Sequence, residues 1–152
     1  MVTNTESLTV GDIILIEKFD LPNIGNDIKD IWAVYMGIDS SLDYPILVYF
    51  SRVTTQKKDF EKGGNRESHR YIDFPEEEYK KYGFSEPCLL DLNERPYKVE
   101  KDKFNKYTIV KKKRLPNDFI KRIFDVCLKE YLSPAQLRNI KNSMSQVGIN
   151  YK

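Results

Sequence analysis

The sequence contains a single histidine, His69, and two cysteines, Cys88 and Cys127, among its 152 residues. One histidine restricts any Ser-His-Asp arrangement to His69, and no nucleophile-elbow motif is present. The two cysteines are far apart and lack the spacing of metal ligands, which excludes a zinc site and predicts two buried thiols. The pair Gly63-Gly64 lacks the spacing and the following lysine of a phosphate-binding loop.

The chain also lacks a strong excess of charge. Its 25 Lys and Arg residues nearly balance 23 Asp and Glu residues, for a net charge of +2, so any nucleic-acid surface has to come from local clustering. The acidic triplet at residues 76–78 falls within one helical turn, where its members cannot all face one metal, and predicts a solvated surface. We therefore expect no metal and no cofactor.

Long apolar runs are absent as well. No stretch approaches the length of a membrane-spanning helix, and the first residues have neither the basic nor the apolar segment of a secretion signal. We expect a cytoplasmic protein with no membrane segment.

What the sequence does contain is a concentrated apolar, β-branched and aromatic run at residues 45–56, which predicts a central strand with a polar carboxyl end. Alternation along a strand places Arg52 and Thr54 on the same side. A cation and a hydroxyl group are thereby expected to project together. The alternative is that both residues form the solvated end of the strand, which is common for these residue types.

The remaining pattern predicts a mainly β fold. Residues 20–30 and 57–68 are expected to be loops, the second a hairpin loop, and the first three strands an antiparallel meander. Six short strands with frequent turn signals are typical of a small barrel or a strongly bent sheet. The predicted strands lie at residues 10–19, 31–38, 45–56 and 69–74, within 87–99, and at 107–110.

The chain changes character after residue 115. Asn117 is the predicted N-cap of a helix whose apolar residues recur at spacings of three and four. Ser133 and Pro134 predict the start of a second helix that continues to about Met144. The predicted organisation is one domain, with a β-barrel at residues 1–115, two packed helices at 116–144 and a fraying tail at 145–152.

Short motifs follow one another in a recognisable order between residues 10 and 132. They are Gly11-Asp12-Ile13, Trp32-Ala33-Val34-Tyr35, the run at residues 45–56, His69 with Ile72, Tyr82-Gly83-Phe84, Leu89-Leu90-Asp91-Leu92, Arg95 ahead of residues 99–104, and a helix after Leu115. This succession resembles the MazF/PemK toxins, the endoribonuclease components of bacterial type II toxin-antitoxin systems. The second helix and the tail have no counterpart in the resemblance.

The resemblance implies an SH3-like barrel that forms a homodimer, cleaves single-stranded RNA without a metal, and is bound by an acidic antitoxin protein. The family uses an arginine at the start of the second strand and a Ser or Thr at the end of the third. Thr54 matches the hydroxyl residue, with Thr55 as the alternative one position later. The arginine has no counterpart, because Lys29 and Asp30 occupy the matching place.

Two cations are candidates to replace that arginine. Arg52 projects from the same strand face as Thr54, and Lys29 lies just before the second strand. If neither acts in this way, the chain is a non-catalytic binding or regulatory module that works through protein contacts. We therefore predict Thr54 and Arg52 as catalytic residues, and Lys29, Thr55, Gln56, Lys57, Arg70 and Arg95 as RNA-binding residues.

Three further features of the sequence each allow two interpretations of their role. His69 is a candidate general base, although a lone histidine at the start of a strand more often has a structural role. Arg95 either contacts RNA or braces the adjacent turn. The basic run at residues 111–114 is either a solvated junction or a phosphate contact.

Overall fold

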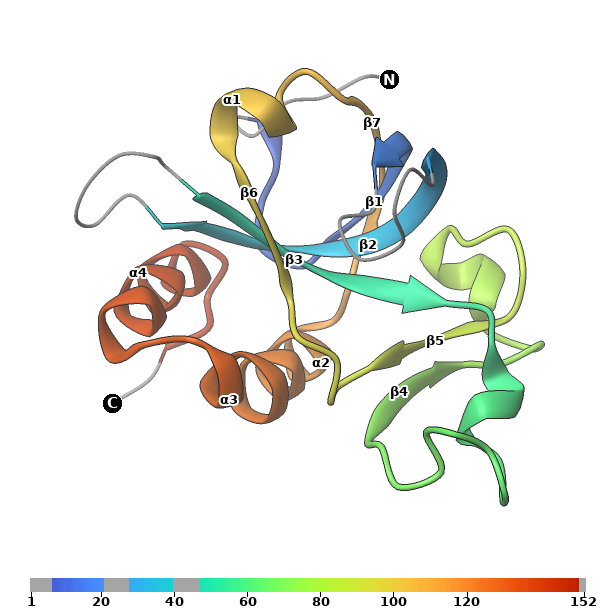
Figure 1. The fold of residues 1–152 in the computed structure, drawn as a ribbon. Helices are drawn as coiled ribbons and strands as arrows, with labels where there is room; N and C mark the ends of the chain where they lie inside the picture. The colour runs from blue at the N-terminus through green and yellow to red at the C-terminus, as the bar shows by residue number, and fades with distance from the viewer. Residues whose placement is uncertain (1–6, 21–27, 40–46, 151–152) are drawn as a thin grey trace.

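The structure is a computed structural model that describes residues 7–20, 28–39 and 47–150. Its seven strands form one antiparallel sheet in the order β4-β5-β3-β2-β1-β7, and β6 also pairs with β3 (Figure 1). The prediction of a mainly β fold with C-terminal helices is confirmed. The strands are β1 (Asp12–Asp20), β2 (Ile28–Asp39), β3 (Leu47–Thr54), β4 (Tyr71–Phe74), β5 (Cys88–Asp91), β6 (Tyr97–Glu100) and β7 (Thr108–Arg114).

The first three strands form the predicted antiparallel meander, and β3 is central. On one side β3 pairs with β2 along its whole length. On the other side it pairs first with β6, through residues 47–50, and then with β5, through Val53 and Thr54. Ser51 and Arg52 fall between these two pairings. The strand therefore changes partner at the predicted cation.

Both faces of the central strands are buried, and successive side chains alternate between them. Tyr49 and Val53 belong to one core cluster, together with residues of the C-terminal helices. Phe50 belongs to the other cluster, with Phe19 and Phe104. The sheet is thus the middle layer of the protein, and its internal strands are fixed from both sides.

The C-terminal helices cover one face of the sheet (Figure 1). Helix α2 (Asn117–Arg122), the π-helix η4 (Ile123–Leu128) and α3 (Lys129–Tyr131) follow one another without a break, and α4 (Pro134–Ser145) turns back against β2. The contact with β2 is close, because a Cβ at Gly37 would lie 3.1 Å from Cδ1 of Ile140. Gly37 has a φ of 123°, which glycine adopts most readily.

The observed N-cap residue agrees with the prediction at one helix and differs from it at another. Ser133 forms the predicted capping box with Gln136 at the start of α4. The prediction for Asn117 is wrong, because the N-cap of α2 is Pro116. The Asn117 side chain instead accepts a hydrogen bond of 2.7 Å from Nη2 of Arg114.

Several connections differ from the predictions. Residues 57–70 do not form a β3–β4 hairpin, since β5 lies between these strands in the sheet. They contain the 3₁₀ turn η2 (Lys57–Phe60) and further turns. The strand predicted within residues 87–99 is divided into β5 and β6, which raises the number of strands from six to seven. The helical turn α1 (Lys101–Phe104), which follows β6, was not predicted, whereas the helical turn expected around residues 75–82 is present as η3 (Tyr79–Tyr82).

The two segments predicted as a loop and a tail are partly ordered. Residues 28–30 of the predicted loop belong to β2, and residues 21–27 lie outside the described residues. In the predicted tail, Ile149 is only 4% exposed, and its N–H donates to the Met144 carbonyl at 3.0 Å. The chain is therefore held against the helices as far as Ile149.

Candidate functional site

A cavity of about 380 Å³ opens where β3 changes partner. Its lining combines three strands with the segment that follows β3. Four of the predicted site residues meet in it, namely Lys29, Arg52, Thr54 and Gln56. The other lining residues are Arg66, His69, Asp91 and Glu94.

Strand pairing explains why the predicted residues meet. Arg52 and Thr54 are separated by two positions of β3 and share a face. Because β2 runs antiparallel to β3 and Ala33 pairs with Arg52, the beginning of β2 lies beside the end of β3. Lys29, near that beginning, is thereby brought to the Thr54 end of the cavity.

Arg52 and Thr54 each keep hydrogen-bonding capacity. Within the described part of the chain, Nε of Arg52 is buried without a hydrogen-bond partner. The Oγ1 atom of Thr54 accepts a hydrogen bond of 3.1 Å from the Gln56 N–H, which leaves the hydroxyl proton to be donated elsewhere. Both side chains are suited to binding an anionic oxygen.

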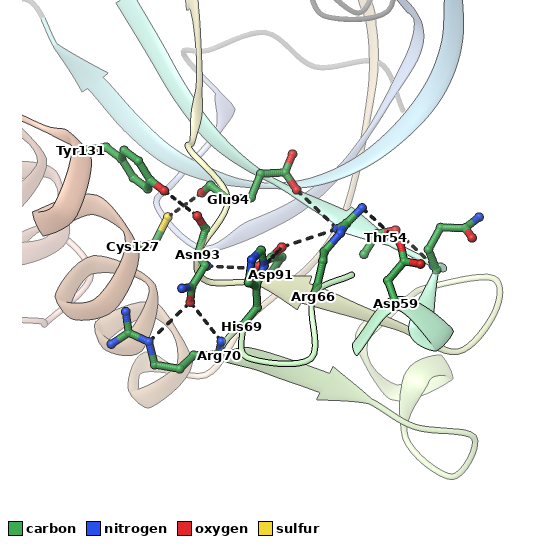
Figure 2. A network of polar contacts seen from close by, with 11 residues as sticks. Thr54, Asp59, Arg66, His69, Arg70, Asp91, Asn93, Glu94, Cys127 and Tyr131 are labelled. Carbon is green, nitrogen blue, oxygen red and sulfur yellow. Dashed lines mark hydrogen bonds and ion pairs between the residues drawn. The ribbon is translucent and has the colours of Figure 1, made fainter. Parts of the chain in front are cut away.

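Arg66 lies at the centre of the polar network in Figure 2. Its guanidinium lies 3.6 Å from the Asp59 carboxylate, 3.5 Å from that of Asp91 and 4.0 Å from that of Glu94. It also lies 5.3 Å from the centroid of the Phe60 ring, a cation-π distance. Buried Phe60 and the surrounding carboxylates thus hold a half-buried cation at the wall of the cavity.

His69 and Asp91 form a hydrogen-bonded pair (Figure 2). Nδ1 of His69 lies 2.9 Å from Oδ2 of Asp91, whose side chain is 1% exposed. The other carboxylate oxygen, Oδ1, accepts from the Asn93 N–H at 2.9 Å. Because the carboxylate accepts, Nδ1 is the donor of this hydrogen bond, and Nε2 is not used by the pair.

Glu94 is the titratable group that this surrounding perturbs most clearly. Burial raises the pKa of the Glu94 carboxyl, Arg52 lowers it in part, and Asp91 raises it further. A carboxyl group with a raised pKa in a cavity holds its proton closer to neutral pH. It is therefore suited to accept and return a proton during a reaction.

The other four predicted binding residues lie outside this cavity. Thr55 is exposed at the end of β3. Lys57 is 2.7 Å from Asp73, and the Arg70 N–H donates to Oδ1 of Asn93 at 3.0 Å. Arg95 lies over the Tyr131 ring and lines a second cavity.

Arg66, Asp91 and Glu94 are site residues that the sequence analysis did not assign. The sequence could have indicated Asp91, because a carboxylate at the end of an apolar strand is expected to be buried with a partner. Arg66 was one basic residue among many. Glu94 left no signal, because it lies in the connection between β5 and β6, which the sequence pattern merges into one strand.

Two further observations bear on the class of protein. In the ranges that the structure describes, no three His, Cys, Asp or Glu side chains are grouped so that they could hold a metal ion. In the same ranges, no helix is long and apolar enough to span a membrane. No protein-family model, no curated protein and no solved structure matches the chain.

Proposed function

We propose that the protein is an endoribonuclease that cleaves single-stranded RNA with its own side chains as base, acid and cations. The observation that supports this most directly is the shared cavity. It places a carboxyl group with a raised pKa, a His-Asp pair and three cationic residues around one space. Cleavage of an RNA phosphodiester requires these three kinds of group.

The reaction attacks the phosphorus with the adjacent ribose 2′-oxygen and expels the 5′-oxygen of the next nucleotide. Glu94 takes the proton of the 2′-hydroxyl group as the new P–O bond forms. His69, charged in its imidazolium form and stabilised by Asp91, donates the Nε2 proton to the departing 5′-oxygen. The products are a 2′,3′-cyclic phosphate and a free 5′-hydroxyl group, and a later proton exchange restores Glu94 and His69.

The cations stabilise the charge that builds up on the phosphorane oxygens. Arg52 and Lys29 supply positive charge near Thr54, whose hydroxyl group donates to the same oxygens. Arg52 would then replace the family arginine that this chain lacks. Its buried Nε, which has no partner among the described residues, supports this role.

The resemblance to the MazF/PemK toxins extends the proposal to fold family and partners. On this proposal the bent sheet is an SH3-like barrel, and the chain is a toxin that forms a homodimer. An acidic antitoxin segment would cover Arg52 and Thr54, because carboxylates can take the place of RNA phosphates there.

The test is incubation of the purified protein with a long single-stranded RNA in the presence of EDTA. We expect cleavage by the wild type and a loss of about 10²- to 10³-fold in R52A, with a smaller loss in T54A. R138A is the matched control, since Arg138 is an exposed arginine on α4 outside the cavity. Intact RNA with folded wild-type protein would refute the ribonuclease and favour the binding-module alternative.

A further inference from the structure

A second cavity, of about 270 Å³, adjoins the proposed catalytic cavity. Glu94 lines both cavities, so the two spaces share one wall residue. The second cavity lies at the start of β6, where the β5–β6 connection meets helices α3 and α4. Its other lining residues are Tyr49, Arg95, Pro96, Tyr97, Lys98, Tyr131, Leu132 and Gln136.

Aromatic rings in this cavity are held in fixed positions. Tyr97 stacks on Phe50 with ring centroids 5.5 Å apart and planes inclined by 20°. The Tyr131 hydroxyl donates to the Asn93 carbonyl at 2.5 Å, which ties this ring to the connection that carries Glu94. Both tyrosines are half-buried. Their positions therefore need little further ordering when a planar group binds in the cavity.

The polar side chains of the cavity differ in how much hydrogen-bonding capacity is free for a ligand. Nε2 of Gln136 donates to the Tyr49 hydroxyl at 2.7 Å, and Oε1 accepts from the Ser133 N–H at 2.9 Å. Gln136 is thus largely occupied within the fold. Arg95 is exposed, and its guanidinium lies 4.9 Å from the centroid of the Tyr131 ring, so its N–H groups remain at the mouth of the cavity.

We propose that this cavity binds the base of a nucleotide next to the phosphate that is cleaved, and that it favours guanine. This inference rests on the proposed ribonuclease function and adds a specificity site to it. Stacking on fixed aromatic rings suits any base, and the cavity lies below the roughly 300–1,000 Å³ typical of sites for larger ligands. A guanidinium fork pairs best with the O6 and N7 acceptors of guanine.

Cleavage-site mapping on an RNA that contains all four bases in every context tests the proposal. We expect wild-type cuts beside guanine, and a loss of about tenfold to a hundredfold in this preference for R95A. R95K, which keeps the charge and lacks the fork, should also lose the preference while retaining more of the overall RNA affinity. R138A is the matched control, because Arg138 is an exposed arginine on α4 that lines neither cavity.

Binding of 3′-GMP and 3′-UMP, measured by tyrosine fluorescence with H69A and R95A, separates this proposal from the ribonuclease proposal. Stronger binding of 3′-GMP that persists in H69A and is lost in R95A supports the base site even if the wild type cuts no RNA. Equal binding of the two nucleotides, or a cleavage preference unchanged in both Arg95 variants, would overturn the base site while leaving the ribonuclease intact.

Discussion

Nδ1 of His69 lies 2.9 Å from a carboxylate oxygen of Asp91, which is almost completely withdrawn from solvent. His69 lies just before β4 and Asp91 is the last residue of β5. The antiparallel pairing of β4 with β5 brings these two positions together. The hydrogen bond between them fixes the orientation of the imidazole ring. Asp91 thus acts as a positioning residue for His69.

The first prediction concerns this positioning. In D91N the amide cannot stabilise an imidazolium, so the rate of RNA cleavage should fall about 10²- to 10⁴-fold. The pH dependence of the remaining cleavage rate should also change. If Asp91 had only a structural role, the rate could fall without such a change. Single-turnover cleavage over a range of pH measures both effects. D73N is the matched control, because Asp73 is exposed and pairs with Lys57 outside the cavity. Equal rates in D91N and D73N would contradict the assignment.

The second prediction concerns the activity of Glu94. As the base it must be ionised, so cleavage should decrease as the pH falls through its raised pKa. The acidic limb of the pH profile should lie above the ordinary range of a glutamate. E94Q should lose about 10²- to 10⁴-fold in rate and also lose this limb, whereas E67Q, at an exposed glutamate, should keep both. A limb that persists in E94Q would assign it to another group.

The third prediction concerns the effect of the Glu94 carboxyl group on the free energy of unfolding. Because its pKa is raised in the folded protein, the unfolded chain releases the proton first as the pH rises. The wild type should therefore lose stability relative to E94Q from the ordinary glutamate pKa up to the raised one. Below that window the difference should be constant. Urea unfolding of both proteins between about pH 3 and pH 8 measures it, and a difference independent of pH would refute the burial of this charge.

The fourth prediction concerns the two thiols. Burial raises the pKa of Cys88 and of Cys127 to about 12. Their residues are 2% and 0% exposed, respectively. Neither thiol should react with a disulfide reagent such as DTNB at pH 8 while the protein is folded, and both should react in denaturant. Rapid reaction of one thiol in the native protein would show that its segment opens.

The fifth prediction concerns the cap of α4. S133A removes an acceptor for the Gln136 N–H and should lower the free energy of unfolding by about 0.5–2 kcal/mol. It should also loosen Gln136, which holds the Tyr49 hydroxyl at the second cavity. Thermal unfolding measures the loss, with S85A, at an exposed serine in a bend, as the control. Equal midpoints for the two variants would argue against a stabilising cap.

Local pattern was sufficient to predict the central part of the fold. The concentrated apolar run around Tyr49 and Phe50 predicted a central strand, and the meander of β1, β2 and β3 follows from their order in the chain. Alternation along this strand placed Arg52 beside Thr54. These features depend on neighbours in sequence or on consecutive strands, which periodicity records.

The rest of the site depends on pairings between distant segments. Periodicity does not show that β3 exchanges β6 for β5 beside Arg52, and this exchange is what opens the space for Glu94. The position of β4 beyond β5 likewise separates it from β3 and places His69 against Asp91. Non-local contacts of this kind are fixed by packing of the whole domain, so a hairpin loop was the wrong prediction for residues 57–68.

The sheet has a border at β7, which pairs with β1 alone in the part of the chain that the structure describes. Its exposed residues include Lys111, Lys112 and Lys113. Lysines on a border strand oppose the addition of a strand from another molecule, because the approaching chain would meet a row of positive charges. Two copies of this protein are therefore not expected to join by continuing their sheets across β7, and self-association has to use another face.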